Sequence, residues 1–342
     1  MQKSFKFRFL YDVKLIVFRS FLLPLFCVIL AQISFAQDPA FSQFFANPLH
    51  VNPALAGTSE LPRAVVNYRN QWPQKGTTFT TYSVSYDQTS RSSHSGVGFQ
   101  VYHDKELNNI INTSAASFSY SYHLKLNTWN FVTLGLQAGG VLKQFNTKQF
   151  IFSSNIDQLS GEILGTSPYF SDEKKLYPDF AVGAVGQHNQ FFWGLSAFHI
   201  TRPNESIIEG DQKGNIPVKY TLHAGMRTKK FHNGLLSREF TFSPNILYQQ
   251  QGTFKQLNLG IYFIEQSFLF GGWLRNNMDT RPDAIIALIG LARNKFQFGY
   301  SFDYTLSKLS DYSFGSHEIS LTFFLGNLDG APVRDKLLIP MI

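Results

Sequence analysis

The sequence predicts an all-β protein, a transmembrane antiparallel β-barrel of about fourteen strands. From Val65 to Leu325, segments of about eight to twelve residues alternate apolar and polar side chains and are separated by turns. Aromatic residues make up 16% of the chain and charged residues only 15%, whereas about 25% of the residues of an ordinary globular protein are charged. Past residue 36, no apolar run approaches the roughly 20 residues that a membrane-spanning helix needs.

The alternation has the polarity of a membrane barrel rather than that of a soluble sandwich. One predicted strand places Phe118, Tyr120 and Tyr122 on one face and the intervening serines on the other, because successive side chains of a strand point to opposite faces. The segment 296–304 repeats this arrangement. Small polar residues behind an aromatic face do not fill a core, so we expect lipid on the aromatic side and a polar lumen on the other.

The lengths of the gaps between strands predict the orientation of the barrel. The even-numbered gaps are mostly short, and the two longest gaps, about 144–177 and 200–217, are odd-numbered. Barrels of this kind have short periplasmic turns and long external loops, so both ends of the barrel are expected in the periplasm. Twelve or sixteen strands remain compatible with this parity. The expected strands are 63–70, 77–87, 94–103, 113–124, 130–143, 178–187, 190–199, 218–228, 238–250, 255–265, 268–276, 282–291, 294–303 and 314–325.

Residues 1–36 are predicted to be an export signal, with a basic start, a short apolar stretch and a cleavage site at Ser34 and Ala36, before Gln37. An uncleaved signal anchor is the alternative. Phe26 is too bulky for a lipoprotein site, so Cys27, the single cysteine, should leave with the signal. Cleavage removes five basic residues and one acidic residue and lowers the net charge from +7 to +3, which argues against nucleic acid as a partner.

Residues 37–62 form an apolar segment between the signal and the first strand. Two Asn-Pro steps are expected to make tight turns, and Ala56-Gly57 allows a sharp turn into the barrel. We expect this segment to pack in the barrel lumen, to plug or cap its periplasmic side, or to bind a partner. The motif, partner or plug candidates are Asp38, Pro39, Phe41, Ser42, Gln43, Phe44, Asn47, Pro48, Asn52, Pro53, Ala56, Gly57, Arg69, Gln71 and Trp72.

The motif DP-x-FSQ-F…NPL…NPA-x-AG, followed by Tyr68-Arg69-x-Gln71-Trp72, resembles the PorP/SprF family of the type IX secretion system, as does the closing stretch 299–324. The resemblance implies an outer-membrane barrel that supports secretion or surface anchoring of proteins such as adhesins with a type B C-terminal domain. It also implies periplasmic or lipoprotein partners from the same machinery. The expected organisation is a signal at 1–36, the motif segment at 37–62, the barrel at 63–325 and a periplasmic tail at 326–342. The tail departs from the family's usual ending.

No catalytic motif emerges: there is no H-E-x-x-H, and Gly194-LSAF lacks the second glycine of a nucleophile elbow. We therefore expect no enzyme activity, cofactor or metal. A solute channel or transporter is the alternative function, and a barrel enzyme that uses His123 or His223 is a more distant one. Charged residues on the polar faces are expected to pair across the lumen. The lumen candidates are Asp87, Asp179, His223, Arg275 and Asp303, and the external-loop candidates are Tyr169, Phe170, Asp172, Arg202 and Asn204.

Overall fold

The computed structural model describes residues 38–73, 79–90, 94–127, 130–146, 156–157, 160, 162, 173–206, 214–228, 231–233, 238–278, 282–293, 295–306 and 314–326. All of them belong to the unit that follows residue 36. The predicted signal, almost all of the predicted tail, and the loop candidates Tyr169, Phe170 and Asp172 lie outside the described residues. Within the described part, no helix is long and apolar enough to cross a membrane.

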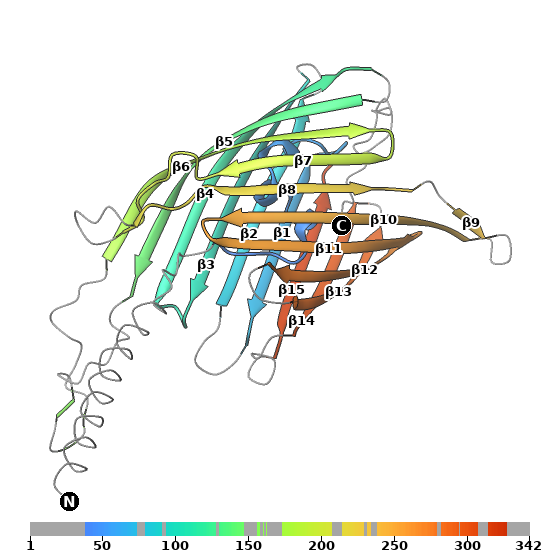
Figure 1. The fold of residues 1–342 in the computed structure, drawn as a ribbon. Helices are drawn as coiled ribbons and strands as arrows, with labels where there is room; N and C mark the ends of the chain where they lie inside the picture. The colour runs from blue at the N-terminus through green and yellow to red at the C-terminus, as the bar shows by residue number, and fades with distance from the viewer. Residues whose placement is uncertain are drawn as a thin grey trace, which may run out of the picture. The chain divides into compact units, whose positions relative to one another are not determined.

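Fourteen antiparallel strands close into a barrel, as the sequence predicts. The last strand pairs with the first, β15 with β1, and β10 pairs with β11, so the ring has no open edge (Figure 1). A short additional strand, β9, pairs only with β10. The strands are β1 (Arg63–Gln71), β2 (Phe79–Ser90), β3 (Ser95–Glu106), β4 (Ile111–Lys125), β5 (Asn130–Phe145), β6 (Glu173–His188), β7 (Phe191–Phe198), β8 (Lys219–Met226), β9 (Phe231–Asn233), β10 (Arg238–Gln251), β11 (Phe254–Glu265), β12 (Phe268–Asn277), β13 (Pro282–Arg293), β14 (Phe296–Thr305) and β15 (Ser316–Phe324).

The two faces of the strands follow the predicted alternation. Phe118 is 53% exposed, while Ser119 and Ser121, on the opposite face of β4, are 0% exposed. Likewise, Leu259 of β11 is 45% exposed and its neighbour Asn258 is 0% exposed. The apolar side chains of these strands therefore face outward, where lipid lies, and the small and polar ones face the lumen.

The connections divide the barrel into two ends. The short connections between β6 and β7, between β11 and β12 and between β13 and β14 lie at one end, which we call the short-turn end, together with the start of β1 and the end of β15. The segments 146–172 and 199–218 connect strands at the opposite end, called here the long-loop end. The predicted parity of short and long connections is confirmed. One connection at the short-turn end, from β8 to β10, is longer and contains β9.

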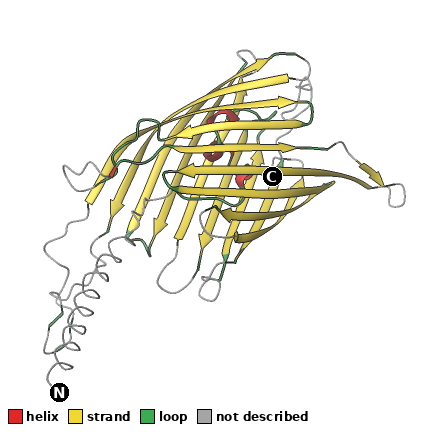
Figure 2. Cartoon of the chain, in the orientation of Figure 1, coloured by secondary structure: helices red, strands yellow, loops and turns green. Residues whose placement is uncertain are grey.

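Residues 38–58, which precede β1, fold inside the ring of strands (Figure 2). They form three short helices, η1 (Phe44–Ala46), α2 (Pro48–Val51) and η2 (Pro53–Leu55). Asn47 and Asn52 precede the prolines that open α2 and η2, and the Asn52 side chain accepts a hydrogen bond from the Ala54 N–H at 2.9 Å. The turns predicted at the two Asn-Pro steps are therefore present. We call Asp38–Thr58 the lumen segment.

Candidate functional site

The lumen segment is bound to the barrel wall by a buried carboxylate of β15. The backbone N–H groups of Ser42 and Gln43 donate to the two carboxylate oxygens of Glu318 at 2.6 and 3.1 Å. The Gln43 side chain extends this contact, because its amide donates to the Glu318 carbonyl at 2.9 Å and accepts from Ser320 Oγ at 2.6 Å. Glu318 is 0% exposed. A buried carboxylate costs free energy unless it is hydrogen-bonded and paired, so Glu318 depends on the lumen segment for its two backbone donors.

Two arginines complete this charge network from β1 and β12. Arg69 lies 2.9 Å from Asp303 and 3.1 Å from Glu318, and Arg275 lies 3.0 Å from Asp303. The hydroxyl of Ser42 donates to Asp303 at 2.6 Å and accepts from Arg275 at 2.7 Å. Arg69, Asp303 and Arg275 do pair, but they lie on nearby strands at one side of the ring rather than across the lumen as predicted. Ser42 is inserted at the centre of this group.

The two asparagine side chains hold the middle of the lumen segment. The Asn47 amide accepts from Gln100 Nε2 at 2.7 Å and donates to Ser83 Oγ at 3.3 Å. On the other side of the lumen, Asn52 Nδ2 donates to the carbonyls of Ala184 and Leu195 at 3.1 and 3.0 Å. Both asparagine side chains therefore bind the wall, and only that of Asn52 also caps the helix that follows it.

Apolar contacts fill the space between these polar anchors. Phe45 packs edge-on against Phe192 and Tyr262 at centroid distances of 5.9 and 6.4 Å, and Phe44 packs against Trp273 at 5.1 Å. Phe44 and Phe45 are 3% and 2% exposed. Full burial of one such side chain stabilises the docked state by about 1.5–3 kcal/mol before ordering costs are subtracted. The lumen is therefore apolar on the side of β7, β11 and β12, which differs from the expected uniformly wet interior.

Glycines of the wall make room for the backbone of the lumen segment. A Cβ atom on Gly183 would lie 1.9 Å from Asn52 Oδ1, and a Cβ atom on Gly135 would lie 2.2 Å from the Ala54 nitrogen. Any side chain at these two positions collides with η2 or its cap. The glycines on the lumen side of β5 and β6 are thus a docking surface for the segment.

The lumen segment leaves the barrel at the short-turn end beside Asp87. The Gly57 N–H donates to Asp87 Oδ2 at 2.9 Å, and Arg63 binds the same carboxylate, with its Nε 2.8 Å from Oδ1. Ser121 Oγ donates to the Ala56 carbonyl at 2.6 Å. Gly57 has φ +63°, a conformation that glycine adopts without strain. The predicted sharp turn into β1 is confirmed.

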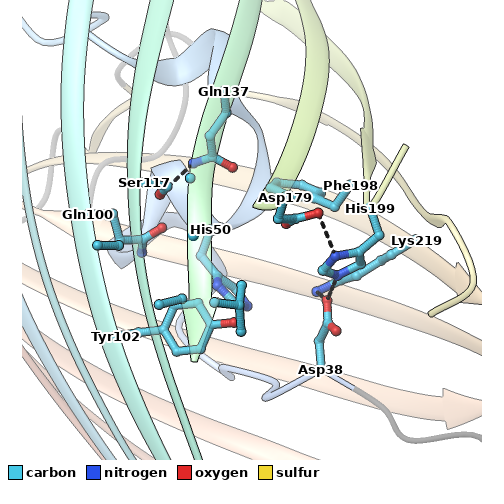
Figure 3. Close-up of a pocket in the computed structure, with 15 residues that line it drawn as sticks. Asp38, His50, Gln100, Tyr102, Ser117, Gln137, Asp179, Phe198, His199 and Lys219 are labelled. Carbon is cyan, nitrogen blue, oxygen red and sulfur yellow. Dashed lines mark hydrogen bonds and ion pairs between the residues drawn. The ribbon is translucent and has the colours of Figure 1, made fainter. Parts of the chain in front are cut away.

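The opposite terminus of the lumen segment, Asp38, lies at the long-loop end. His199, directly after β7, and Lys219, at the start of β8, approach its Oδ2 atom at 2.9 and 3.1 Å (Figure 3). Gln251 donates to its Oδ1 atom at 3.1 Å. His199 also contacts Asp179 at 3.0 Å. We call Asp38, His199, Lys219, Gln251 and Asp179 the Asp38 cluster.

The charges of this cluster favour the ionised forms of Asp38 and His199. Burial alone would raise the pKa of Asp38, but His199 and Lys219 outweigh burial and hold the pKa well below its usual value. Burial alone would lower the pKa of His199, but Asp38 and Asp179 raise it to about 10. Beside the cluster lies a cavity of about 40 Å³ whose lining includes His50 and Asp38 (Figure 3), room for a few water molecules.

The sequence placed some of these residues correctly and others not. Of the places expected for the segment, it occupies the lumen and does not stop at the periplasmic mouth. The segment crosses the lumen from Asp38 at the long-loop end to Gly57 at the short-turn end, because its polar groups find partners along the whole wall. Gln71 and Trp72 remain outside the site. Gln71 ends β1 opposite Ser316, and the Trp72 N–H donates to Gly315 O at 3.0 Å.

The remaining candidates have mixed outcomes. The Pro39 carbonyl contacts His50 Nε2 at 3.0 Å, and Phe41 packs on the same ring. His223 is 2% exposed in the lumen, and its Nε2 lies 3.4 Å from Asn52 Nδ2. In the loop after β7, Arg202 is exposed, whereas Asn204 is half-buried in a bridge to Asn215. Sequence reasoning missed Arg63, Glu318, His199, Lys219 and Gln251.

The missed residues carry weak signals. Glu318 alternates with outward apolar residues of the closing strand, and this position was open to the same reasoning that selected Asp303.

Among the described residues, no group of three or more His, Cys, Asp or Glu side chains is arranged to hold a metal ion.

Comparison with known proteins identifies the family. The model of the family described as "Type IX secretion system membrane protein PorP/SprF" matches residues 33–323. The chain belongs to the PorP/SprF family. No curated protein matches the chain by sequence. As a member of this family with a closed barrel fold, the protein resides in the outer membrane.

Solved outer-membrane barrels resemble the chain in fold at very low identity. The KdgM porin in complex with disordered oligogalacturonate is 8% identical with a TM-score of 0.36, over 77% of this chain and 99% of that one. The Acinetobacter baumannii outer membrane protein Omp33 is 7% identical with a TM-score of 0.41, over 78% and 100%. CdiB from Acinetobacter baumannii is 7% identical with a TM-score of 0.44, over 78% and 60%.

Proposed function

We propose that this PorP/SprF protein is a non-catalytic component of the type IX secretion system that acts by binding partner proteins, with its lumen closed by its own lumen segment. The observation that carries the proposal is the burial of that segment. Ser42, Gln43, Asn47 and Asn52 are all 0% exposed, and their partners lie on strands distributed around the ring. A diffusion pore needs a continuous path of water through the lumen, and the segment occupies that path.

The long-loop end offers an ordered surface for an exported partner. The connection after β7 is held against the inner wall, with Glu205 2.5 Å from Lys143 of β5 and Ile216 packed with Val141 and Tyr177. Loops held by a rigid scaffold are suited to recognition. Secreted proteins with a type B C-terminal domain, adhesins among them, are the partners that family membership supports. Periplasmic or lipoprotein components would meet the short-turn end.

Conductance tests the closed lumen. The purified wild-type protein in planar bilayers should show no steady ion current, whereas a variant that lacks residues 38–55 behind an intact signal should conduct. Heat-modifiable migration on gels verifies that the shortened barrel is folded. A steady current through the wild-type protein would contradict the proposal and support the alternative, a channel for small solutes.

Retention of exported proteins tests the partner-binding role. Cells that lack the gene should release type IX substrates of the type B class into the medium or fail to secrete them, and the wild-type gene should restore surface retention. Quantitative mass spectrometry of the outer membrane and the medium reports both outcomes. Arg202→Glu, in the exposed part of the loop after β7, should reduce retention, while Asn127→Asp in a short turn serves as the control. Unchanged distribution of all such substrates in the gene deletion would refute the role.

A further inference from the structure

The direction in which the lumen segment crosses the barrel has a consequence for the cell surface. Asp38 binds Lys219, at the first residue of β8, and Gln251, at the last residue of β10. Both positions lie at the long-loop end. Gly57 binds Asp87, close to the end of β2 at the short-turn end. The segment therefore runs the length of the lumen, and its N-terminal side lies at the end opposite to the start of β1.

The sidedness of an outer-membrane barrel assigns these two ends. Short turns and both ends of the strand series face the periplasm, and long loops face the exterior. The covalent connection of the lumen segment to β1, through Gly57 and Arg63, is then periplasmic. Its other terminus, Asp38, is at the external mouth.

We propose that contacts at the external mouth of the barrel hold the lumen segment in place, and we call the segment in this role the strap. Its N-terminal end is displayed at the cell surface, and its release from the lumen begins when Asp38 leaves its partners. The Asp38 carboxylate occupies a site built by the cationic groups of Lys219 and His199 (Figure 3) and by the side-chain amide of Gln251. An external partner that competes for these groups with a carboxylate of its own frees the strap without opening a strand pair. A periplasmic partner would have to pull on the connected end.

The strap also requires a free N-terminus. The apolar stretch predicted as part of the export signal ends directly before Gln37, one residue from Asp38. If it stayed attached and anchored in the inner membrane, Asp38 would not reach the outer mouth. Docking of the strap therefore follows cleavage of the signal. This inference extends the proposed function and does not depend on it, because it concerns the position of the segment rather than the identity of any secreted protein.

Thiol labelling in intact cells tests the position of the N-terminal end. Ala40 is exposed, and Ala40→Cys should react with a membrane-impermeant maleimide without disruption of the outer membrane. Asn127→Cys, in the exposed turn between β4 and β5, is the control and should react only after permeabilisation. The unsubstituted protein gives the background, since its one cysteine, Cys27, lies in the predicted signal. Labelling of Ala40→Cys only after permeabilisation would overturn the proposal.

A second measurement tests the fastening at Asp38. Ala46 is 1% exposed, so Ala46→Cys should react only when the strap leaves the lumen. Adding Asp38→Asn should speed this reaction about tenfold or more, because the labelling rate follows the open population. Asp283→Asn, at the same end of the barrel and outside the cluster, is the matched control. Equal rates with and without Asp38→Asn would overturn the fastening role, whether or not any secreted partner is retained.

Discussion

Glu318 gives the sharpest test of how the lumen segment is held. Its carboxylate accepts from the backbone N–H groups of Ser42 and Gln43 and lies 3.1 Å from Arg69 Nη1, all in a site with no solvent exposure. Glu318→Gln keeps the size of the side chain but replaces one acceptor oxygen with an NH₂ donor. The new NH₂ group then faces one of the donors that bind the carboxylate in the wild-type protein, and Arg69 loses one of its two carboxylate partners.

The magnitude follows from the contacts that are lost. Hydrogen bonds to a charged group contribute about 1.5–3 kcal/mol each, and breaking a buried ion pair by removal of one partner costs about 3–5 kcal/mol. We expect the docking free energy of the lumen segment to fall by about 3–5 kcal/mol, which raises its open population roughly a hundredfold to several thousandfold. The barrel itself should persist, because its strand pairing is unchanged.

Hydrogen exchange followed by mass spectrometry measures this directly. The peptide that contains the Ser42 and Gln43 amides should exchange faster in Glu318→Gln, while peptides from β4 and β5 keep the wild-type rate. Glu205→Gln is the matched control, since it removes a charge from an ion pair with Lys143 at the long-loop end, outside the network around Ser42. Wild-type exchange at Ser42 and Gln43 in a folded Glu318→Gln barrel would refute the assigned role of the carboxylate.

Three further predictions follow from the lumen and the outer face. Gly183→Val should expel the lumen segment and open a conducting path, whereas Gly272→Ala, whose Cβ meets nothing within 4 Å, should leave bilayer recordings unchanged. Leu259→Arg on the lipid face should cost about 2–4 kcal/mol of barrel stability, measured by urea unfolding in liposomes. The raised pKa of His199 and the lowered pKa of Asp38 mean that their contact stabilises docking fully from about pH 4 to 6.5. This stabilisation is lost as the pH rises through about 10 or falls through the lowered pKa of Asp38. Protection of the lumen segment from exchange, relative to the intrinsic rate at each pH, should therefore be highest in this window, and protection that does not change with pH would exclude the ion pair.

The architecture was predictable because each strand carries its own evidence. Phe118 and Ser119 are adjacent in the sequence, yet Phe118 is exposed on the outer face of the barrel and Ser119 is buried on the lumen face. A repeat of two residues therefore predicts both the fold class and the face on which each side chain lies. The strand count and the parity of the loops followed from the same local pattern. β9 was not predicted, since a three-residue strand at a turn carries no measurable period.

The site was predictable in its parts but not in its connections. Arg69, Arg275 and Asp303 were recognisable as lumen charges because they alternate with outward apolar residues. Their common partner, Ser42, lies 261 positions from Asp303 in the chain, and no local rule connects positions so far apart. In the sequence, His199 and Lys219 are residues at strand ends with no feature that links them to Asp38. Their role becomes visible only in the folded protein, where both contact the Asp38 carboxylate.

The position of Asp38 could not be predicted from the sequence. The sequence left the lumen, its periplasmic mouth and a partner open as places for the segment, and its length is compatible with a path through the whole lumen. Residues 38–57 are about twenty, and even with helical turns at about 1.5 Å per residue they reach about 30 Å, the thickness of the hydrocarbon core. A cap would leave the buried carboxylates Glu318 and Asp303 with fewer donors, at several kcal/mol for each uncompensated charge. The need to pair these buried carboxylates therefore favours a segment that crosses the lumen over one that only covers its periplasmic mouth. The crossing path places Asp38 at the long-loop end.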